Sequence, residues 1–306
     1  MKKIILLLFV TVFISCGEST DKEKDVTKKN SIEGFWNRIG TIQLVNGVPV
    51  DTLYIKNSDT PDYKQIKVFK DGNMIWLNNF KDSLSPWKGG AGGYGKFSVF
   101  SKDSLTEFIS HGTGGWGAWV KRYKDSLNVP TWNFGLKTNI SDNNYSQING
   151  PESKFAEYWE RMSIDKPKTK FDGAWKRVYE IAYINGKAVD TTAVPSDISL
   201  DIKIMSNGRY TYQVDMTGMF DSDEAGYGGY GGYGTFEYDA EKKILSEYQE
   251  WGSGGNIVVN EPMTSVDNHE INFYNDDMFI QISKTSVGVL QNQKATARGV
   301  VYRRIK

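Results

Sequence analysis

Cysteine, histidine and net charge are scarce in this 306-residue chain, and each scarcity excludes a class of protein. A single cysteine cannot form an intrachain disulfide, so stability has to come from buried apolar surface. Two histidines beside one cysteine are too few for the usual zinc sites, and we expect neither a metal nor a cofactor. Because 37 basic residues are balanced by 37 acidic ones, no basic surface is expected to displace counterions from phosphates, and we expect no nucleic-acid partner.

An apolar run lies at the N-terminus, where residues 4–14 follow Lys2 and Lys3. At about 1.5 Å per helical residue, this run is too short to cross a hydrocarbon core of about 30 Å. A positive start, a short apolar stretch and a small residue after it are typical of a secretory signal peptide. The stretch leads directly to Cys16.

The segment that ends at Cys16 resembles the processing site of a bacterial lipoprotein. The resemblance implies that residues 1–15 are a signal peptide, that Cys16 carries fatty acyl chains such as palmitate, and that residues 16–31 form a flexible tether. The acidic residues after the cysteine, beginning with Glu18, resemble the surface-export signal of lipoproteins in Bacteroidetes-type bacteria. We therefore expect a lipid-anchored protein of the outer membrane, on its periplasmic face or at the cell surface. Ordinary secretion with cleavage nearby and a short uncleaved anchor are the alternatives.

After the tether, the sequence is a tandem repeat. Short motifs of the first half recur in the second half, in the same order and at an offset close to 139 residues. The matched pairs include Gly34/Gly173, Trp36/Trp175, Arg38/Arg177, Asn46/Asn185, Val50/Val189, Asp51/Asp190, Tyr94/Tyr233 and Trp159/Tyr302. Proline and charge replace the apolar pattern near residues 165–169. We therefore predict two domains, at residues 32–165 and 166–306.

Both halves have the pattern of an antiparallel β-sheet. Every second residue is apolar in residues 198–204, which predicts a strand with one dry face and one face toward solvent. The pairs Asp71-Gly72 and Asn207-Gly208 are typical of tight type I′ turns, because both central residues need a positive φ. We expect about eight strands in each half, one of them at residues 117–123, which is the number that closes an up-and-down barrel. No window of about 12 residues has convincing helical periodicity.

Two sets of residues, one in each half, resemble the signature of a known family. Each set has a Gly-x-Trp motif in the first strand and an arginine at the end of the last strand: Gly34, Trp36 and Arg161, then Gly173, Trp175 and Arg304. This pattern resembles the lipocalin-like (calycin) barrels, and in particular the tandem lipocalin-like lipoproteins of Bacteroidetes-type bacteria. The resemblance implies that each tryptophan packs across the closed end of its barrel, beneath the arginine, through a cation–π interaction. Fatty-acid-binding-like and other meander barrels fit the same pattern.

The glycine-rich stretches also contain aromatic residues. The pattern G-x-G-x-x-G occurs four times, at residues 90–95, 112–117, 226–231 and 229–234. We expect no helix after any of them, and therefore no dinucleotide site. We expect flexible loops whose aromatic side chains either cover the barrel ends or form a surface for a lipid chain or a sugar ring. The candidate binding residues are Trp87, Tyr94, Trp116, Trp119, Tyr227, Tyr230, Tyr233 and Trp251.

Residues suited to catalysis or metal binding are sparse. His111 lies beside a glycine-rich turn and His269 in a polar stretch, so we expect an exposed loop histidine and a polar turn. The sequence contains no nucleophile elbow and no P-loop pattern. The acidic clusters near Asp221 and Asp276 do not have the spacing of a calcium loop. We expect no catalytic residues and no enzymatic activity.

Three classes of function follow from these observations. The resemblance implies a membrane-anchored, monomeric, non-catalytic lipoprotein that binds a small hydrophobic or amphipathic molecule in a barrel. The alternative is a surface lipoprotein with filled barrels that binds a glycan or another surface partner through its aromatic loops. An enzyme is the third class, and nothing in the sequence requires it. Because Trp87 and Trp116 have no tryptophan counterparts in the second half, we expect the halves to differ in what they bind.

Overall fold

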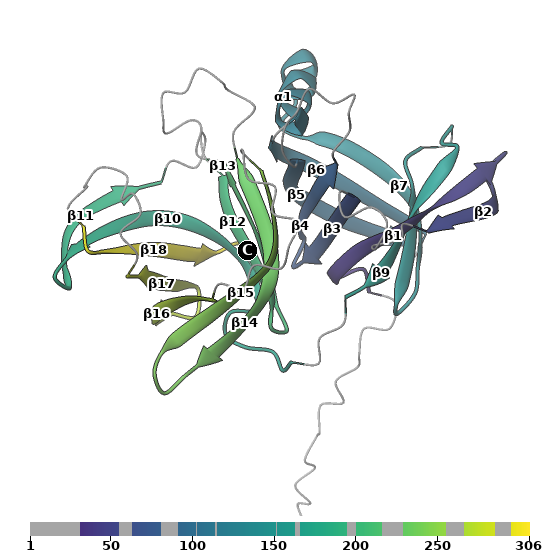
Figure 1. Cartoon of the computed structure of the whole chain (residues 1–306). Helices are drawn as coiled ribbons and strands as arrows, with labels where there is room; N and C mark the ends of the chain where they lie inside the picture. Colours follow the sequence, from purple (N-terminus) through teal and green to yellow (C-terminus); the bar gives the residue numbers. More distant parts are fainter. Residues whose placement is uncertain are drawn as a thin grey trace, which may run out of the picture.

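The computed structural model describes residues 31–54, 63–80, 91–101, 103–113, 115–150, 152–162, 166–194, 200–215, 229–254, 266–284 and 295–306. In these ranges, antiparallel strands form two sheets, and each sheet closes into a barrel (Figure 1). Eight strands close each barrel, and one more strand flanks its rim. The predicted all-β fold of two tandem barrels is confirmed and is consistent with a lipocalin-like fold. The predicted signal peptide, Cys16 and nearly all of the tether lie outside the described residues.

Barrel 1 is built from the first nine strands. They are β1 (Gly34–Val45), β2 (Val48–Tyr54), β3 (Tyr63–Lys70), β4 (Asn73–Phe80), β5 (Ala91–Ser101), β6 (Ser104–Thr113), β7 (Trp132–Ile140), β8 (Asn144–Ile148) and β9 (Phe155–Arg161). Along one edge of β1, the first residues pair with β3 and the last residues pair with β2. The other edge of β1 pairs with β9, and this pairing closes the barrel. The β1–β2 hairpin therefore extends one wall beyond the barrel (Figure 1).

Barrel 2 repeats this arrangement strand by strand. Its strands are β10 (Gly173–Ile184), β11 (Lys187–Ala193), β12 (Leu200–Ser206), β13 (Arg209–Asp215), β14 (Tyr230–Asp239), β15 (Ile244–Gly254), β16 (Val266–Asn275), β17 (Met278–Ser283) and β18 (Ala297–Arg304). The pairing of β10 with β18 closes this barrel, and β11 extends it as a hairpin.

The hairpin turns have the predicted geometry. Asp71 and Gly72 have φ angles of 49° and 71°, and Asn207 and Gly208 have φ angles of 50° and 79°. Positive φ at both central residues is what a type I′ turn requires, so the two turn predictions are confirmed. An asparagine–glycine pair turns the β1–β2 and β10–β11 hairpins in the same way.

The alternating strands are buried on both faces, which corrects the prediction of a solvent-exposed face in residues 198–204. In β12, Ile202 and Ile204 pack in an apolar cluster that is shared with barrel 1. Asp201 and Lys203, on the opposite face, are each 4% exposed and lie inside barrel 2. The apolar face therefore meets the other barrel, and the polar face lines the interior.

The two barrels pack through equivalent strands, with β3, β4 and β5 of one facing β12 to β15 of the other (Figure 1). Gln213 Nε2 donates a hydrogen bond across this interface to Thr113 Oγ1 at 2.9 Å. Lys64 Nζ lies 4.8 Å from the centre of the Tyr233 ring. The shared apolar cluster is formed by Phe35, Ile66, Val68, Ile75, Leu77, Tyr94, Ala174, Leu200, Ile202, Ile204, Tyr233 and Trp251.

The helix α1 (Gly115–Leu127) is a departure from the sequence prediction, which expected a strand at residues 117–123. It lies beside β6 (Figure 1), packs Val120 into the core of barrel 1, and ends at Asn128 with a φ of 51°. The apolar residues of this segment, Trp116, Trp119, Val120, Tyr123 and Leu127, do recur at helical spacing, and the two glycines in its first turn weigh against a helix only by propensity. In the part of the chain that the structure describes, no helix has the length and apolar character needed to cross a bilayer.

Trp36 and Arg161 meet at the closed end of barrel 1. They are register partners in β1 and β9, and Arg161 Cζ lies 4.0 Å from the centre of the Trp36 ring. Trp175 and Arg304 meet in the same way in barrel 2, at 4.1 Å. Gly34 has a φ of 132°, and a Cβ atom there would lie 2.6 Å from Arg161 Nη1. The glycine of the Gly-x-Trp motif is therefore what lets the arginine cover the tryptophan.

Candidate functional site

A cavity of about 360 Å³ lies inside barrel 1, toward the end opposite the Trp36–Arg161 pair. Its volume is in the range of pockets that hold small molecules. Its polar lining consists of Arg38, Gln65, Lys67, Asn78, Glu107, Gln147, Asn149 and Glu157. Its apolar lining consists of Trp76, Ile109, Trp132, Phe134, Leu136 and Phe155. The cavity is therefore amphipathic.

Lys67 lies at the centre of the polar lining. It points inward because its two neighbours in β3 take the outer face, toward barrel 2. Lys67 Nζ donates hydrogen bonds to Glu107 Oε1 at 2.8 Å and to Gln147 Oε1 at 3.0 Å, and it lies 5.2 Å from the centre of the Trp159 ring. Burial raises the pKa of Glu107, and the Lys67 ammonium opposes that rise. We refer to Lys67, Glu107 and Gln147 as the triad of barrel 1.

Arg38 and Glu157 form the rest of the charged lining. Arg38 donates hydrogen bonds to Gln65 Oε1 at 2.8 Å and to Thr41 Oγ1 at 3.1 Å. Its Nη1 atom lies 3.6 Å from Glu157 Oε1. The other carboxylate oxygen, Glu157 Oε2, is buried and has no hydrogen-bond partner among the described residues. The two cations and two carboxylates that line the cavity have no formal net charge.

Aromatic side chains form the outer wall of the cavity. The ring centre of Trp132 lies 4.2 Å from that of Phe134 and 5.3 Å from that of Tyr123 in α1. Phe155, the first residue of β9, is 47% exposed and completes the apolar lining. β7 pairs with β6 from its first residue, but it pairs with β8 only over residues 137–140. The sheet is therefore interrupted beside the apolar wall.

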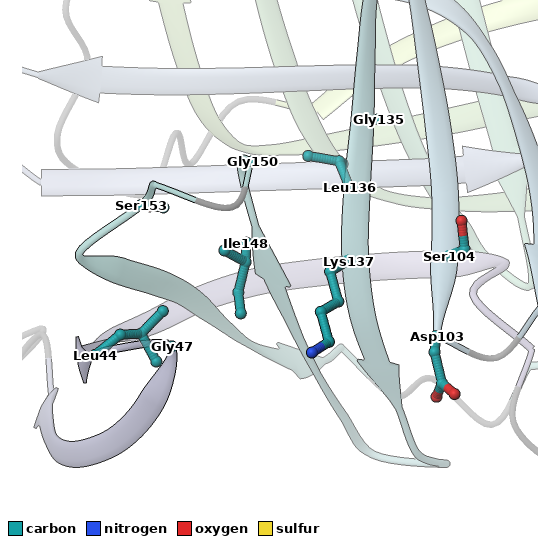
Figure 2. Close-up of a pocket in the computed structure, with 10 residues that line it drawn as sticks. All are labelled: Leu44, Gly47, Asp103, Ser104, Gly135, Leu136, Lys137, Ile148, Gly150 and Ser153. Carbon is teal, nitrogen blue, oxygen red and sulfur yellow. The ribbon is translucent and has the colours of Figure 1, made fainter.

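A second hollow, of about 490 Å³, lies at the same interruption of the sheet (Figure 2). Figure 2 shows its lining residues, which come from the β1–β2 hairpin, the β5–β6 turn and the start of β6, β7, the end of β8 and the β8–β9 connection: Leu44, Gly47, Asp103, Ser104, Gly135, Leu136, Lys137, Ile148, Gly150 and Ser153. Leu136 lines both hollows, so it is part of the wall between them.

Barrel 2 contains the same triad with an added histidine. Lys203 Nζ donates hydrogen bonds to Glu247 Oε1 at 2.6 Å and to Gln281 Oε1 at 3.2 Å. His269 Nε2 lies 3.6 Å from Glu247 Oε2, and its Nδ1 lies 2.8 Å from Ser283 Oγ. Burial by itself would raise the pKa of Glu247, but Lys203 and His269 outweigh it and hold this pKa at about 2.

Ion pairs occupy the positions in barrel 2 that surround the cavity in barrel 1. Arg177, the counterpart of Arg38, pairs with Glu180 and, at 2.9 Å, with Asp201. Glu180 also pairs with Arg298 at 3.1 Å. By strand register, the equivalent positions are Thr41/Glu180, Gln65/Asp201, Phe155/Arg298 and Glu157/Val300.

Three of the aromatic candidates are buried between the barrels. Tyr94, Tyr233 and Trp251 lie in strands and are at most 9% exposed, so the prediction of flexible loops is wrong for these residues. The neighbouring glycines explain the error, because they permit close packing within strands. A Cβ atom on Gly93 would overlap the indole of Trp76 inside barrel 1.

The remaining aromatic candidates are not brought together into one surface. Tyr230 is the first residue of β14 and is 51% exposed. Trp116 and Trp119 belong to α1 rather than to a loop, and their side chains are outside the description. Trp87 and Tyr227 lie outside the described residues.

Both histidines lie in strands, which corrects the predictions of an exposed loop and a polar turn. His111 is half-buried in β6, and its pKa is lowered to about 4 by burial, with Lys124 and Lys176 contributing. His269, in β16, is 8% exposed. Within the described ranges, no group of three or more His, Cys, Asp or Glu side chains could hold a metal ion.

One glycine-rich stretch is followed by a helix, contrary to prediction. Residues 112–117 span the end of β6 and the first turn of α1. Because β6 belongs to an antiparallel sheet, this arrangement is not the βαβ unit that presents a helix N-terminus to a dinucleotide.

The residues that line the cavity were not among the candidates predicted from the sequence. The sequence contains one indication of Lys67 and Lys203. Each is a lysine between two β-branched residues, and the two lysines lie in equivalent strands of the repeat. The sequence contains no such indication of Glu107 and Gln147, since they reach Lys67 across 40 and 80 residues through barrel closure.

No protein-family model matches the chain, and a search of curated proteins finds no match. The barrel fold fits a non-catalytic binding protein in general terms. A fold supports many functions, so the residues of the cavity have to carry the functional argument.

Proposed function

We propose that this chain is a non-catalytic binding protein that holds one small amphipathic molecule inside barrel 1. The observation that carries the proposal is the cavity of about 360 Å³, with paired charges on one side and aromatic rings on the other. The apolar part of such a molecule would contact Trp132, Phe134 and Phe155. Its polar part would lie near Arg38 and Glu157.

The β1–β2 hairpin supports the entry of an apolar molecule. Val48 and Leu53 are 60% and 50% exposed on this hairpin. Through β1, Leu53 is in register with Glu157, so it lies on the face of the sheet that continues into the cavity. At the equivalent positions, the β10–β11 hairpin has Lys187 and Thr192. An apolar lip is therefore a feature of barrel 1.

The N-terminal sequence supports a lipid anchor, which would hold the binding protein at the outer membrane of a Bacteroidetes-type bacterium. Processing at Cys16 predicts that mass spectrometry of the membrane fraction detects an N-terminal peptide that starts at Cys16 and carries acyl chains. A Cys16→Ser variant should remain unprocessed. An unacylated N-terminus at another residue of the wild-type protein would contradict the anchor and leave the binding proposal intact.

Titration with the fluorescent apolar probe N-phenyl-1-naphthylamine tests the cavity. The protein is the chain without residues 1–30, which keeps every described strand. We expect saturable binding by the wild type. Leu136→Trp places a larger ring in the wall and should weaken binding by about tenfold or more.

Asn133→Trp is the matched control, because Asn133 is exposed on the outer face of the same strand. This variant should bind the probe as the wild type does, and thermal unfolding shows whether both variants are folded. Absence of saturable binding by the wild type, or equal binding by the two variants, would contradict the proposal.

A further inference from the structure

We propose that the molecule held in barrel 1 presents a hydrogen-bond donor, a hydroxyl or an amine, to Glu157 Oε2, and that the cavity discriminates against carboxylates. This inference rests on the proposed function and names the chemical class of its ligand. The starting observation is that Glu157 Oε2 is buried without a hydrogen-bond partner among the described residues, although its side chain lines the cavity.

A buried carboxylate oxygen without a donor is unfavourable, because it has lost its water and gained nothing in exchange. Glu157 is only 13% exposed, and its nearest cation, Arg38, lies 3.6 Å from the other oxygen. A carboxylate oxygen can only accept hydrogen bonds, so the group that satisfies Oε2 has to bring the proton. Hydroxyl and amine groups on a ligand do this, whereas an ionised carboxylate does not.

The cations of the cavity are already engaged, which argues against an anionic ligand. Lys67 donates to Glu107 and Gln147, and Arg38 donates to three neutral oxygens besides lying near Glu157. An incoming carboxylate would compete with these partners for the two cations and would also face the charge of Glu157. A protonated amine would give Glu157 Oε2 both a hydrogen-bond donor and a cationic partner.

Barrel 2 does not have this acceptor. Its register places Val300 at the position of Glu157, and Val300 is 9% exposed. The inferred preference for donors therefore belongs to barrel 1, and it does not follow from the triad that both barrels share.

Three eight-carbon probes that differ only in their polar group test the inference: 1-octanol, octylamine and octanoate. Each is used near neutral pH to displace N-phenyl-1-naphthylamine from the chain without residues 1–30. We expect octanol and octylamine to displace the probe at concentrations about tenfold or more below that of octanoate, which is about 1.4 kcal/mol.

Glu157→Gln keeps the shape of the side chain but removes its charge and adds a donor, so the difference between octylamine and octanoate should shrink several-fold. Glu160→Gln is the matched control, because Glu160 is exposed on the same strand. It should leave the difference between octylamine and octanoate unchanged. If Glu157→Gln does not fold, the wild-type ranking alone decides.

The outcomes separate this inference from the proposed function. Saturable probe binding together with equal displacement by all three probes, a preference for octanoate, or no displacement by any of them overturns the inference and leaves a binding cavity. An unchanged ratio between the displacing concentrations of octylamine and octanoate in Glu157→Gln also overturns it. Absence of probe binding to the wild type would remove the proposed function itself.

Discussion

The two barrels share a closed end and a buried triad, and they differ in what lies above that triad. The equivalent triad residues are Lys67/Lys203, Glu107/Glu247 and Gln147/Gln281. In barrel 1 the next layer is an amphipathic cavity, whereas in barrel 2 the equivalent positions hold the ion pairs of Arg177, Glu180, Asp201 and Arg298. The repeat thus keeps the triad that links the strands inside each barrel. It varies the groups toward the end of the barrel opposite the tryptophan–arginine pair, which we call the mouth.

The two triad glutamates show how far a shared geometry can diverge in its electrostatics. The pKa of Glu107 is raised by burial, with the charge of Glu157 adding to the rise. The pKa of Glu247 is held at about 2, because Lys203 and His269 outweigh the effect of burial. By register, His269 takes the position of Leu136, an apolar wall residue of the cavity. One substitution at this position therefore changes both the wall and the charge balance.

Removing the triad lysine of barrel 2 should have the largest effect. Lys203→Met leaves Glu247 buried without its ammonium partner, and we expect the free energy of unfolding to fall by about 3–5 kcal/mol. Lys67→Met should cost less, because Glu107 has a raised pKa and takes up a proton more readily. Urea unfolding followed by circular dichroism measures both losses.

Lys137→Met is the control for these variants, since Lys137 is an exposed lysine in β7. Its stability should match that of the wild type. Equal losses for Lys67→Met and Lys203→Met would contradict the electrostatic difference between the triads.

Acid should act on the two triads in opposite directions. Because the folded pKa of Glu247 lies below its ordinary 4.5, its stabilising contribution is present above that value and is lost as the pH falls toward about 2. The loss amounts to about 3–4 kcal/mol at about 1.4 kcal/mol per pKa unit. The raised pKa of Glu107 has the reverse sign, so its contribution is present at low pH and is lost as the pH rises through the folded pKa.

Urea unfolding at a series of pH values checks both signs. Glu247→Gln should reduce the loss of unfolding free energy as the pH falls below about 4.5. Glu107→Gln should remove the loss of unfolding free energy that accompanies a rise in pH. Profiles that keep the wild-type shape in both variants would show that the two glutamates titrate alike in the folded and unfolded states.

Transplanting the mouth of barrel 2 into barrel 1 should give the smallest change in stability and a clear change in binding. The variant combines Thr41→Glu, Gln65→Asp and Phe155→Arg, which introduces the ion-pair set around Arg38. We expect binding of N-phenyl-1-naphthylamine to weaken by about tenfold or more. A folded triple variant that binds the probe as the wild type does would show that the mouth residues do not determine the cavity.

The local features of the fold could be predicted because they depend on neighbouring residues. Asp71-Gly72 and Asn207-Gly208 encode their turns directly, and the repeat aligns Trp36 with Trp175. The helix α1 was missed although its residues carry a local signal, because Trp116, Trp119, Val120, Tyr123 and Leu127 recur at helical spacing. The two glycines in its first turn and its position after a glycine-rich stretch favoured the strand prediction.

The cavity could not be predicted, because its residues meet only when the barrel closes. Alternation in β3 separates Lys67 from Ile66 and Val68, but it does not say which face is inside. The burial of the apolar face against the second barrel reverses the usual assignment of apolar to core and polar to solvent. The glycines around Tyr94 were misleading for a related reason, since close packing in a strand and flexibility in a loop both select glycine.

Native mass spectrometry tests the central claim, that barrel 1 holds a small molecule and barrel 2 does not. The chain without residues 1–30 would be purified from a bacterial host without detergent, beside its Leu136→Trp and Asn133→Trp variants. The account predicts one small-molecule adduct per chain in the wild type and in Asn133→Trp, and none in Leu136→Trp. Two adducts per chain, or an adduct that persists in Leu136→Trp, would contradict it.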